Sequence, residues 1–117
     1  RPEIKVVFDQ IGTPTYARDL ADAIATMVLT SRWMPGIYHF ANEGACSWYD
    51  FAVAIMEYAG LGCKVTPITS ADFPSAVSRP PFSVLDKSRI KTTYGITIPH
   101  WQNALRRCVQ RTIAGAE

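Results

Sequence analysis

Alternating and periodic apolar residues along the chain predict short strands separated by helices. Residues 4–8 are β-branched or aromatic apart from one lysine, a composition typical of strands. Residues 16–31 carry apolar side chains three and four positions apart, which is the spacing of one helical face. Thr15 stands directly before this helix, and we expect its hydroxyl to cap it. A strand, a loop rich in chain breakers and a helix therefore open the chain.

The same two patterns then repeat. Residues 37–41 predict a second strand, and residues 48–59 predict a second helix with a continuous apolar face. Ser47 precedes Asp50 by three residues, which is the spacing of a capping box. Gly60 suits the left-handed conformation in which many helices end. Both ends of this helix are therefore marked in the sequence.

Residues 64–68 predict a third strand. We expect it at a sheet edge, because Pro67 has no backbone N–H to donate to a neighbouring strand. Strands that alternate with helices are typical of the α/β class, whose parallel strands are joined by right-handed crossovers. We therefore predict an α/β fold with short parallel or mixed strands between helices.

A long connection rich in chain breakers follows this third strand. Residues 69–81 contain three prolines and several serines, and long ordered loops of this kind are often functional. We expect Asp86 to cap a short helix that ends at Tyr94 before Gly95. Pro99 is expected in the first turn of a last helix. The connection is thus the first place to look for a binding site.

Charge and cysteine content narrow the function classes. The chain has 12 basic and 10 acidic residues, and they form no basic stripe that would neutralise nucleic-acid phosphates. The cluster of Arg106, Arg107 and Arg111 is interpreted as a solvated face near a helix C-terminus. The three cysteines have no metal-ligand spacing, so we expect reduced thiols. No apolar run reaches the ~20 residues of a membrane span, and we expect a cytoplasmic protein without nucleic-acid or membrane partners.

The residues that usually carry catalysis are poorly placed. His39 alternates with aromatic residues in the predicted strand at 37–41, and His100 stands beside Trp101 at a predicted helix start, so structural roles are expected for both. Gly60-Leu61-Gly62 follows a helix, whereas a dinucleotide fingerprint precedes one. No motif of a metallohydrolase or a serine hydrolase is present. We predict no catalytic, cofactor-binding or metal-binding residue in this chain.

Two polar loops are candidates for binding an anionic small molecule. Arg79 lies in the long connection next to Pro80 and Pro81, which restrict the backbone, and its guanidinium matches phosphate oxygens. An exposed arginine on a stiff loop is the alternative. Residues 10–15 join a strand to a helix N-terminus, where ligands of open α/β folds usually bind. A helix cap alone would explain Thr15 but not the polar density of this whole loop.

Four segments carry a resemblance to a known family. They are residues 9–21, 36–39, 47–52 and 78–86, and they contain the motifs Asp-Gln-x-Gly-x-Pro-Thr and Arg-Pro-x-x-Ser-x-Leu. In this order they resemble the dTDP-4-dehydrorhamnose reductases, which belong to the extended short-chain dehydrogenase/reductases. The similarity covers nearly the whole chain through Arg107.

The resemblance implies a domain organisation and an activity. Residues 1–117 would be the C-terminal sugar-nucleotide-binding domain of a Rossmann-type enzyme, whose N-terminal NAD(P)-binding domain lies outside this chain. Such an oxidoreductase uses NADPH or NADH to reduce dTDP-4-dehydro-L-rhamnose to dTDP-L-rhamnose. Its catalytic Tyr-x-x-x-Lys pair is absent here, because none of the five tyrosines has a lysine four positions later. The chain alone is therefore expected to be inactive and to bind no cofactor.

The resemblance also ranks the candidate site residues. Arg79 matches the position that extended members of the family use near the diphosphate, and it is the first candidate. The other candidates for substrate binding are Ser83, Gln10, Pro14 and Thr15. Two other functions stay open at this point. One is a non-catalytic regulatory subunit of the same superfamily that binds a partner enzyme, and the other is a small α/β interaction module.

Overall fold

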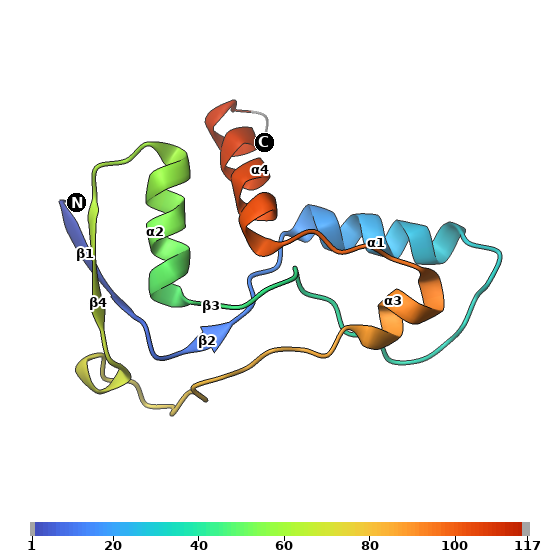
Figure 1. The fold of residues 1–117 in the computed structure, drawn as a ribbon, viewed down its shortest axis with the longest axis horizontal. Helices are drawn as coiled ribbons and strands as arrows, with labels where there is room; N and C mark the ends of the chain where they lie inside the picture. The colour runs from blue at the N-terminus through green and yellow to red at the C-terminus, as the bar shows by residue number, and fades with distance from the viewer. Residues whose placement is uncertain (1, 116–117) are drawn as a thin grey trace.

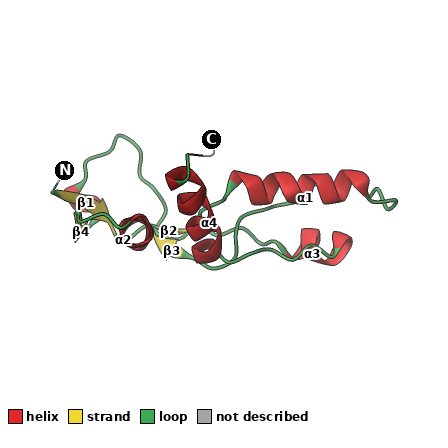
Figure 2. Cartoon of the chain, turned by 90° about the horizontal axis from the view of Figure 1, so that it is seen from above, coloured by secondary structure: helices red, strands yellow, loops and turns green. Residues whose placement is uncertain are grey.

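The computed structural model describes residues 2–115. Its elements are β1 (Glu3–Val7), β2 (Ile11–Gly12), α1 (Ala17–Leu29), β3 (Cys46–Ser47), α2 (Trp48–Ala59), β4 (Lys64–Ile68), the short 3-10 helix η1 (Ser70–Asp72), α3 (Ser88–Tyr94) and α4 (Trp101–Ile113). The molecule is elongated, with β1, β4 and α2 at one end, α1 and α3 at the other, and α4 between them (Figures 1 and 2). The predicted α/β class is confirmed.

Two short sheets carry the strands. β1 and β4 pair in parallel, from Glu3 opposite Lys64 to Val7 opposite Ile68. α2, which directly precedes β4 in sequence, packs against both strands. β2 and β3 form a small antiparallel pair. Within residues 2–115, β4 pairs only with β1, as expected for a strand that contains a proline.

The predicted strand at 37–41 is wrong. These residues form no strand in the described part of the chain. The backbone at the start of this segment and just after its end binds other partners. The carbonyl of Ile37 accepts a hydrogen bond from Arg89, and the amide of Asn42 donates to the carbonyl of Pro14. The Tyr38 ring packs edge-on against Tyr94 of α3, with 5.5 Å between ring centroids. An extended segment that packs against helices has the same alternation as a strand, which explains the error.

The ends of α2 are confirmed. The amide of Asp50 donates to Ser47 Oγ at 2.9 Å, and the Asp50 carboxylate accepts from the Ser47 amide at 3.3 Å. Gly60 ends the helix with a φ of 66°, and Gly95 ends α3 with a φ of 67°. Each of these signals depends on residues that are close in sequence, so the sequence pattern was sufficient to find them.

The predicted starts of the other three helices, namely two caps and one first-turn proline, are wrong by one or more positions. Thr15 does not cap α1: Tyr16 is the N-cap residue, without a side-chain cap bond of its own. α3 has Lys87 as its N-cap residue, although the Asp86 carboxylate still accepts from the amide of Ser88 at 2.9 Å. α4 begins after His100, so Pro99 lies before the helix. The His100 ring caps α4 by accepting from the amide of Gln102.

The main core cluster lies between α2 and α4. Its buried members are Cys46, Ala54, Trp101 and Leu105, with Phe51, Ile55, Tyr58 and Val109 packed against them. α4 contributes Trp101 and Leu105 to this cluster. None of the helices in the described part of the chain is long and apolar enough to cross a membrane.

The arginine cluster of α4 differs from the prediction. Arg107 donates two hydrogen bonds to Asp19 of α1, at 2.9 and 2.7 Å, and Asp19 is buried. Arg106 lies over the ring of Tyr58, 4.9 Å from its centroid. Arg106 and Arg111 are both exposed and fit the predicted solvated face, so the interpretation fails only for Arg107. The interpretation failed because the partner of Arg107 lies far away in sequence.

Candidate functional site

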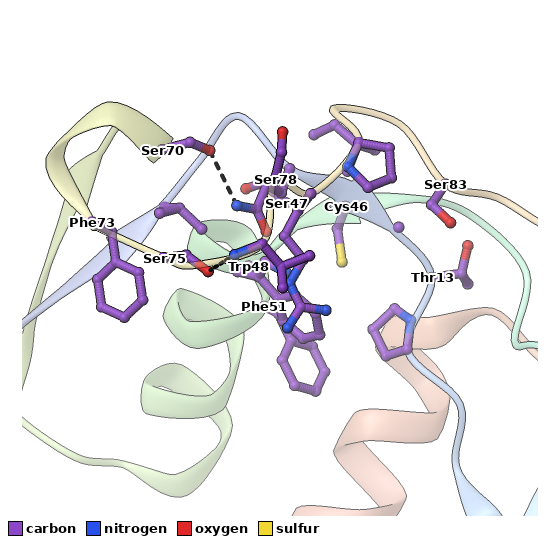
Figure 3. A pocket seen from close by; sticks show the side chains of 18 of the residues that line it. Thr13, Cys46, Ser47, Trp48, Phe51, Ser70, Phe73, Ser75, Ser78 and Ser83 are labelled. Atoms are coloured by element: carbon purple, nitrogen blue, oxygen red, sulfur yellow. Dashed lines mark hydrogen bonds between the residues drawn. The ribbon is translucent and has the colours of Figure 1, made fainter.

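A cleft with a volume of about 1020 Å³ opens where three parts of the chain meet. These parts are the loop after β1, the N-terminal end of α2 and the long connection after β4 (Figure 3). Small-molecule sites usually have volumes of about 300–1,000 Å³. The cleft therefore has room for a ligand as large as a sugar nucleotide.

Four of the five predicted site residues line this cleft: Gln10, Pro14, Arg79 and Ser83. They come from two segments that are far apart in sequence. Thr15 is exposed and does not belong to the lining, so its role in binding has no support from the geometry. The structure thus brings the polar loop and the arginine to one place, as the sequence predicted.

Backbone hydrogen bonds hold these two segments together. The amide of Ile11 donates to the carbonyl of Pro81, and the amide of Ser83 donates to the carbonyl of Ile11, both at 2.8 Å. A Cβ atom at Gly12 would lie 3.3 Å from the carbonyl oxygen of Ser83, so a residue without a side chain suits this close approach. The backbone at Ile11, Pro81 and Ser83 is therefore fixed before any ligand arrives.

One side of the cleft is aromatic, which the sequence did not predict. Trp48, Phe51 and Phe73 line it, and Trp48 and Phe73 are 53% and 61% exposed. The Trp48 ring packs edge-on against Phe51, whose ring lies 6.1 Å from that of buried Trp101. This row of aromatic rings leads from the core to the cleft. It offers a fixed apolar surface on which a planar or apolar part of a ligand can pack.

The sequence did contain a signal for Trp48. Periodicity assigned it to the core face of α2, and Phe51 does pack against the core there. However, Trp48 is the first residue of the helix, directly after the cap residue Ser47. In an α/β fold this end of a helix points to the carboxyl side of the strands, where ligands bind.

The charges around the cleft favour an anion. Within residues 2–115, no carboxylate pairs with Arg79, so its charge is available to a ligand. The N-terminus of α2 also borders the cleft through Ser47 and Trp48, and a helix N-terminus carries a partial positive charge. Both features fit a ligand with phosphate groups.

The thiol of Cys46 lines the cleft but should be unreactive. Burial, with a smaller effect of the nearby Asp50 charge, raises the pKa of Cys46 to about 11. Compared with a thiol whose pKa is about 8.5, its thiolate fraction at pH 8 is lower by a factor on the order of 10². We expect iodoacetamide at pH 8 to label the less buried Cys63 and Cys108 first. Peptide mapping by mass spectrometry measures this order, and early labelling of Cys46 would contradict it.

The described residues contain neither a dinucleotide fingerprint nor a group of metal-ligand side chains. Gly60 and Gly62 follow α2, and Gly60 is the left-handed residue that ends this helix, so they do not form a dinucleotide fingerprint. Among residues 2–115, no three His, Cys, Asp or Glu side chains are grouped in a way that could hold a metal ion.

Comparisons with known proteins identify the family to which this chain is similar. The family model described as RmlD substrate binding domain matches residues 1–113. The chain is 44% identical over 110 residues to the spore coat polysaccharide biosynthesis protein SpsK of Bacillus subtilis, covering 94% of this chain and 38% of that protein. It is 41% identical over 117 residues to the dTDP-4-dehydrorhamnose reductase of Aggregatibacter actinomycetemcomitans, covering 91% of this chain and 40% of that protein.

A solved structure of a dTDP-4-dehydrorhamnose reductase is also similar to this chain. The crystal structure of the dTDP-4-dehydrorhamnose reductase of Bacillus anthracis in complex with NADP superposes with a TM-score of 0.85 at 37% identity, covering 92% of this chain and 37% of that one. The chain therefore spans about two fifths of the length of the relatives that it matches. The resemblance found in the sequence motifs is confirmed. Because the family model matches nearly the whole chain, the chain belongs to the RmlD substrate binding domain family.

Proposed function

We propose that this chain is the sugar-nucleotide-binding part of a dTDP-4-dehydrorhamnose reductase, and that residues 1–117 form one substrate-binding domain. The intact protein would reduce dTDP-4-dehydro-L-rhamnose to dTDP-L-rhamnose with NADPH or NADH. The observation that carries the proposal is the cleft in which Arg79 and the polar loop of Gln10 and Pro14 lie together. Membership of a substrate-binding family supports it.

The cofactor belongs, in this proposal, to a Rossmann domain outside the chain. The Bacillus anthracis relative was solved in complex with NADP, whereas the chain itself has neither a dinucleotide fingerprint nor a Tyr-x-x-x-Lys pair. When bound, the nicotinamide supplies the hydride. The residues of this chain then have one task, which is to hold the sugar nucleotide in a fixed orientation.

The lining of the cleft suggests how it does so. Arg79 would pair with the diphosphate, since a guanidinium can donate two parallel hydrogen bonds to phosphate oxygens. The hydroxyl of Ser83 is a further donor on the same side. The exposed ring of Trp48 would pack against the base or the sugar. Hydrogen bonds from Ile11 to Pro81 and Ser83 hold the end of the Arg79 segment in place, which reduces the entropy lost on binding.

Arg79→Ala tests this assignment in the full-length protein that carries this chain. Loss of a charged hydrogen bond should lower the affinity for dTDP and dTDP-rhamnose by about 1.5 to 3 kcal/mol, or roughly 10- to 150-fold. Arg79→Lys should lose part of this affinity, because the charge stays while the planar fork is lost. Isothermal titration calorimetry measures the affinity of all three proteins for dTDP and dTDP-rhamnose.

Arg18→Ala is the matched control, because Arg18 is exposed on α1 and lies outside the cleft. Equal dTDP affinities for the wild type and Arg79→Ala would remove Arg79 from the site. The reductase activity is tested separately, by following oxidation of NADPH or NADH with dTDP-4-dehydro-L-rhamnose. Binding of dTDP without turnover would favour a non-catalytic regulatory subunit instead.

A further inference from the structure

The Arg79 loop, residues 70–83, is attached at both ends to the short segment that follows β1. We propose that Asp9 is a positioning residue of the substrate cleft, which holds the start of the Arg79 loop through Ser70. Asp9 itself does not line the cleft. The inference rests on the proposed function, because it concerns the affinity for the same sugar nucleotide.

The first attachment is a group of hydrogen bonds on Ser70. The Ser70 amide donates to both carboxylate oxygens of Asp9 at 3.0 Å, and its hydroxyl donates to one of them at 2.7 Å. Gln10 adds a side-chain bond to the Ser70 hydroxyl at 3.1 Å, drawn in Figure 3. The Ser70 amide and hydroxyl also lower the pKa of Asp9, because both donate to its charged form.

The second attachment lies at the other end of the loop. There the backbone of Ile11 exchanges hydrogen bonds with Pro81 and Ser83. Asp9 and Ile11 are two residues apart, so one short segment holds both ends of a loop of 14 residues. The rigid parallel ladder of β1 and β4 leads directly to this segment, with the amide of Phe8 donating to the carbonyl of Ile68.

Between its ends, the Arg79 loop has little packing to fix it. Residues 71–80 are all exposed. Even so, eight of these ten residues, Arg79 among them, line the cleft. Since burial does not hold these residues, their position depends on the two attachments. Without the bonds on Ser70, the loop would be held at its start only from Ile68 at the end of β4, and Arg79 would spend less time facing the cleft.

A double-mutant cycle on dTDP affinity tests the inference. We expect Asp9→Ala to weaken dTDP binding about tenfold in the full-length protein that carries this chain, and the same change to have clearly less effect when Arg79 is already alanine. Such coupling would not arise if Asp9 only stabilised the fold. Isothermal titration calorimetry gives the four affinities, and thermal unfolding shows that all four proteins are folded at the temperature used.

Two further variants complete the experiment. Ser70→Ala removes the hydroxyl from the other side of the contact, and it should weaken dTDP binding in the same direction even if Asp9→Ala does not fold. Glu3→Ala is the matched control: Glu3 is also a carboxylate of β1 and accepts from the Thr66 hydroxyl, but at the end of the strand away from the cleft. Its dTDP affinity should be unchanged.

The outcomes separate the inference from the proposed function. If Arg79→Ala weakens dTDP binding while Asp9→Ala and Ser70→Ala do not, only the inference is overturned. It is also overturned if the losses for Asp9→Ala and Arg79→Ala simply multiply in the double variant, since Asp9 then acts independently of Arg79. If Arg79→Ala leaves the affinity unchanged, the proposed diphosphate contact fails and the role of Asp9 fails with it.

Discussion

Asn42→Asp should destabilise the protein by about 3 to 5 kcal/mol, although the two side chains are nearly identical in shape. Asn42 is 1% exposed. Its amide nitrogen donates to Asp19 at 2.9 Å and to the carbonyl of Pro99 at 3.2 Å, and its oxygen accepts from the amide of Tyr16 at 2.7 Å. An aspartate would place a second carboxylate against Asp19 and would have no hydrogen to donate. Urea unfolding at pH 7, followed by circular dichroism, measures the loss.

Asn103→Asp is the control for this substitution. Asn103 is exposed on α4, and its oxygen accepts from Arg107 at 2.9 Å, a bond that a carboxylate can keep. Its effect should stay within about 0.5 kcal/mol. If the two variants unfold at similar urea concentrations, the buried network around Asn42 does not hold α1 and α4 together as we infer.

The same network gives wild-type stability a dependence on pH. The pKa of Asp19 is lowered chiefly because Arg107 donates to its carboxylate, with a further hydrogen bond from Asn42. A carboxyl with a lowered pKa stabilises the folded state above its unfolded value, here 3.8, and this contribution is lost as the pH falls through the folded pKa. In Asn42→Asp, protonation at low pH would relieve the repulsion. The difference between wild type and variant should therefore become smaller in acid.

This network also shows where prediction from sequence ends. Ser47 and Gly60 were predictable because a capping box and a left-handed end involve residues within a few positions of one another. The donor to Asn42, by contrast, is the amide of Tyr16, the N-cap residue of α1, 26 residues away in sequence. Nothing in the sequence around Asn42 indicates that this residue is buried with Asp19 and bound through it to Arg107. Long-range polar contacts have no local pattern.

The candidate site likewise contains contacts that the sequence predicts and contacts that it does not. The approach of Arg79 to the loop of Gln10 could be predicted. In this fold class the loops that bind ligands follow the carboxyl ends of the strands, and the sequence motifs include both segments. Trp48 was not predicted, since periodicity cannot tell a core residue from one at a helix end that borders a cleft. The anchoring of Ser70 by Asp9 joins residues 61 positions apart. Only the three-dimensional fold reveals that contact.

Gly44→Ala should destabilise the protein by about 2 to 4 kcal/mol, because two penalties combine there. Gly44 has a φ of 89°, a conformation that side chains disfavour. A Cβ atom would also lie 2.5 Å from Nε2 of His100 and 2.9 Å from the ring of Trp101. Neither ring can easily move, since the His100 ring caps α4 through its other nitrogen and Trp101 is buried in the core. Urea unfolding measures the loss.

Two other glycines separate the two penalties. Gly60 has a φ of 66° but nothing within 4 Å of its Cβ position, so Gly60→Ala should show the backbone penalty alone, about 1 to 2 kcal/mol. Gly62 has neither a positive φ nor a close neighbour, and Gly62→Ala should change stability by less than about 1 kcal/mol. If Gly44→Ala lowers the free energy of unfolding by no more than Gly60→Ala does, the His100 ring moves aside for the new methyl group. The junction between Gly44 and α4 would then be looser than the caps and contacts of this helix imply.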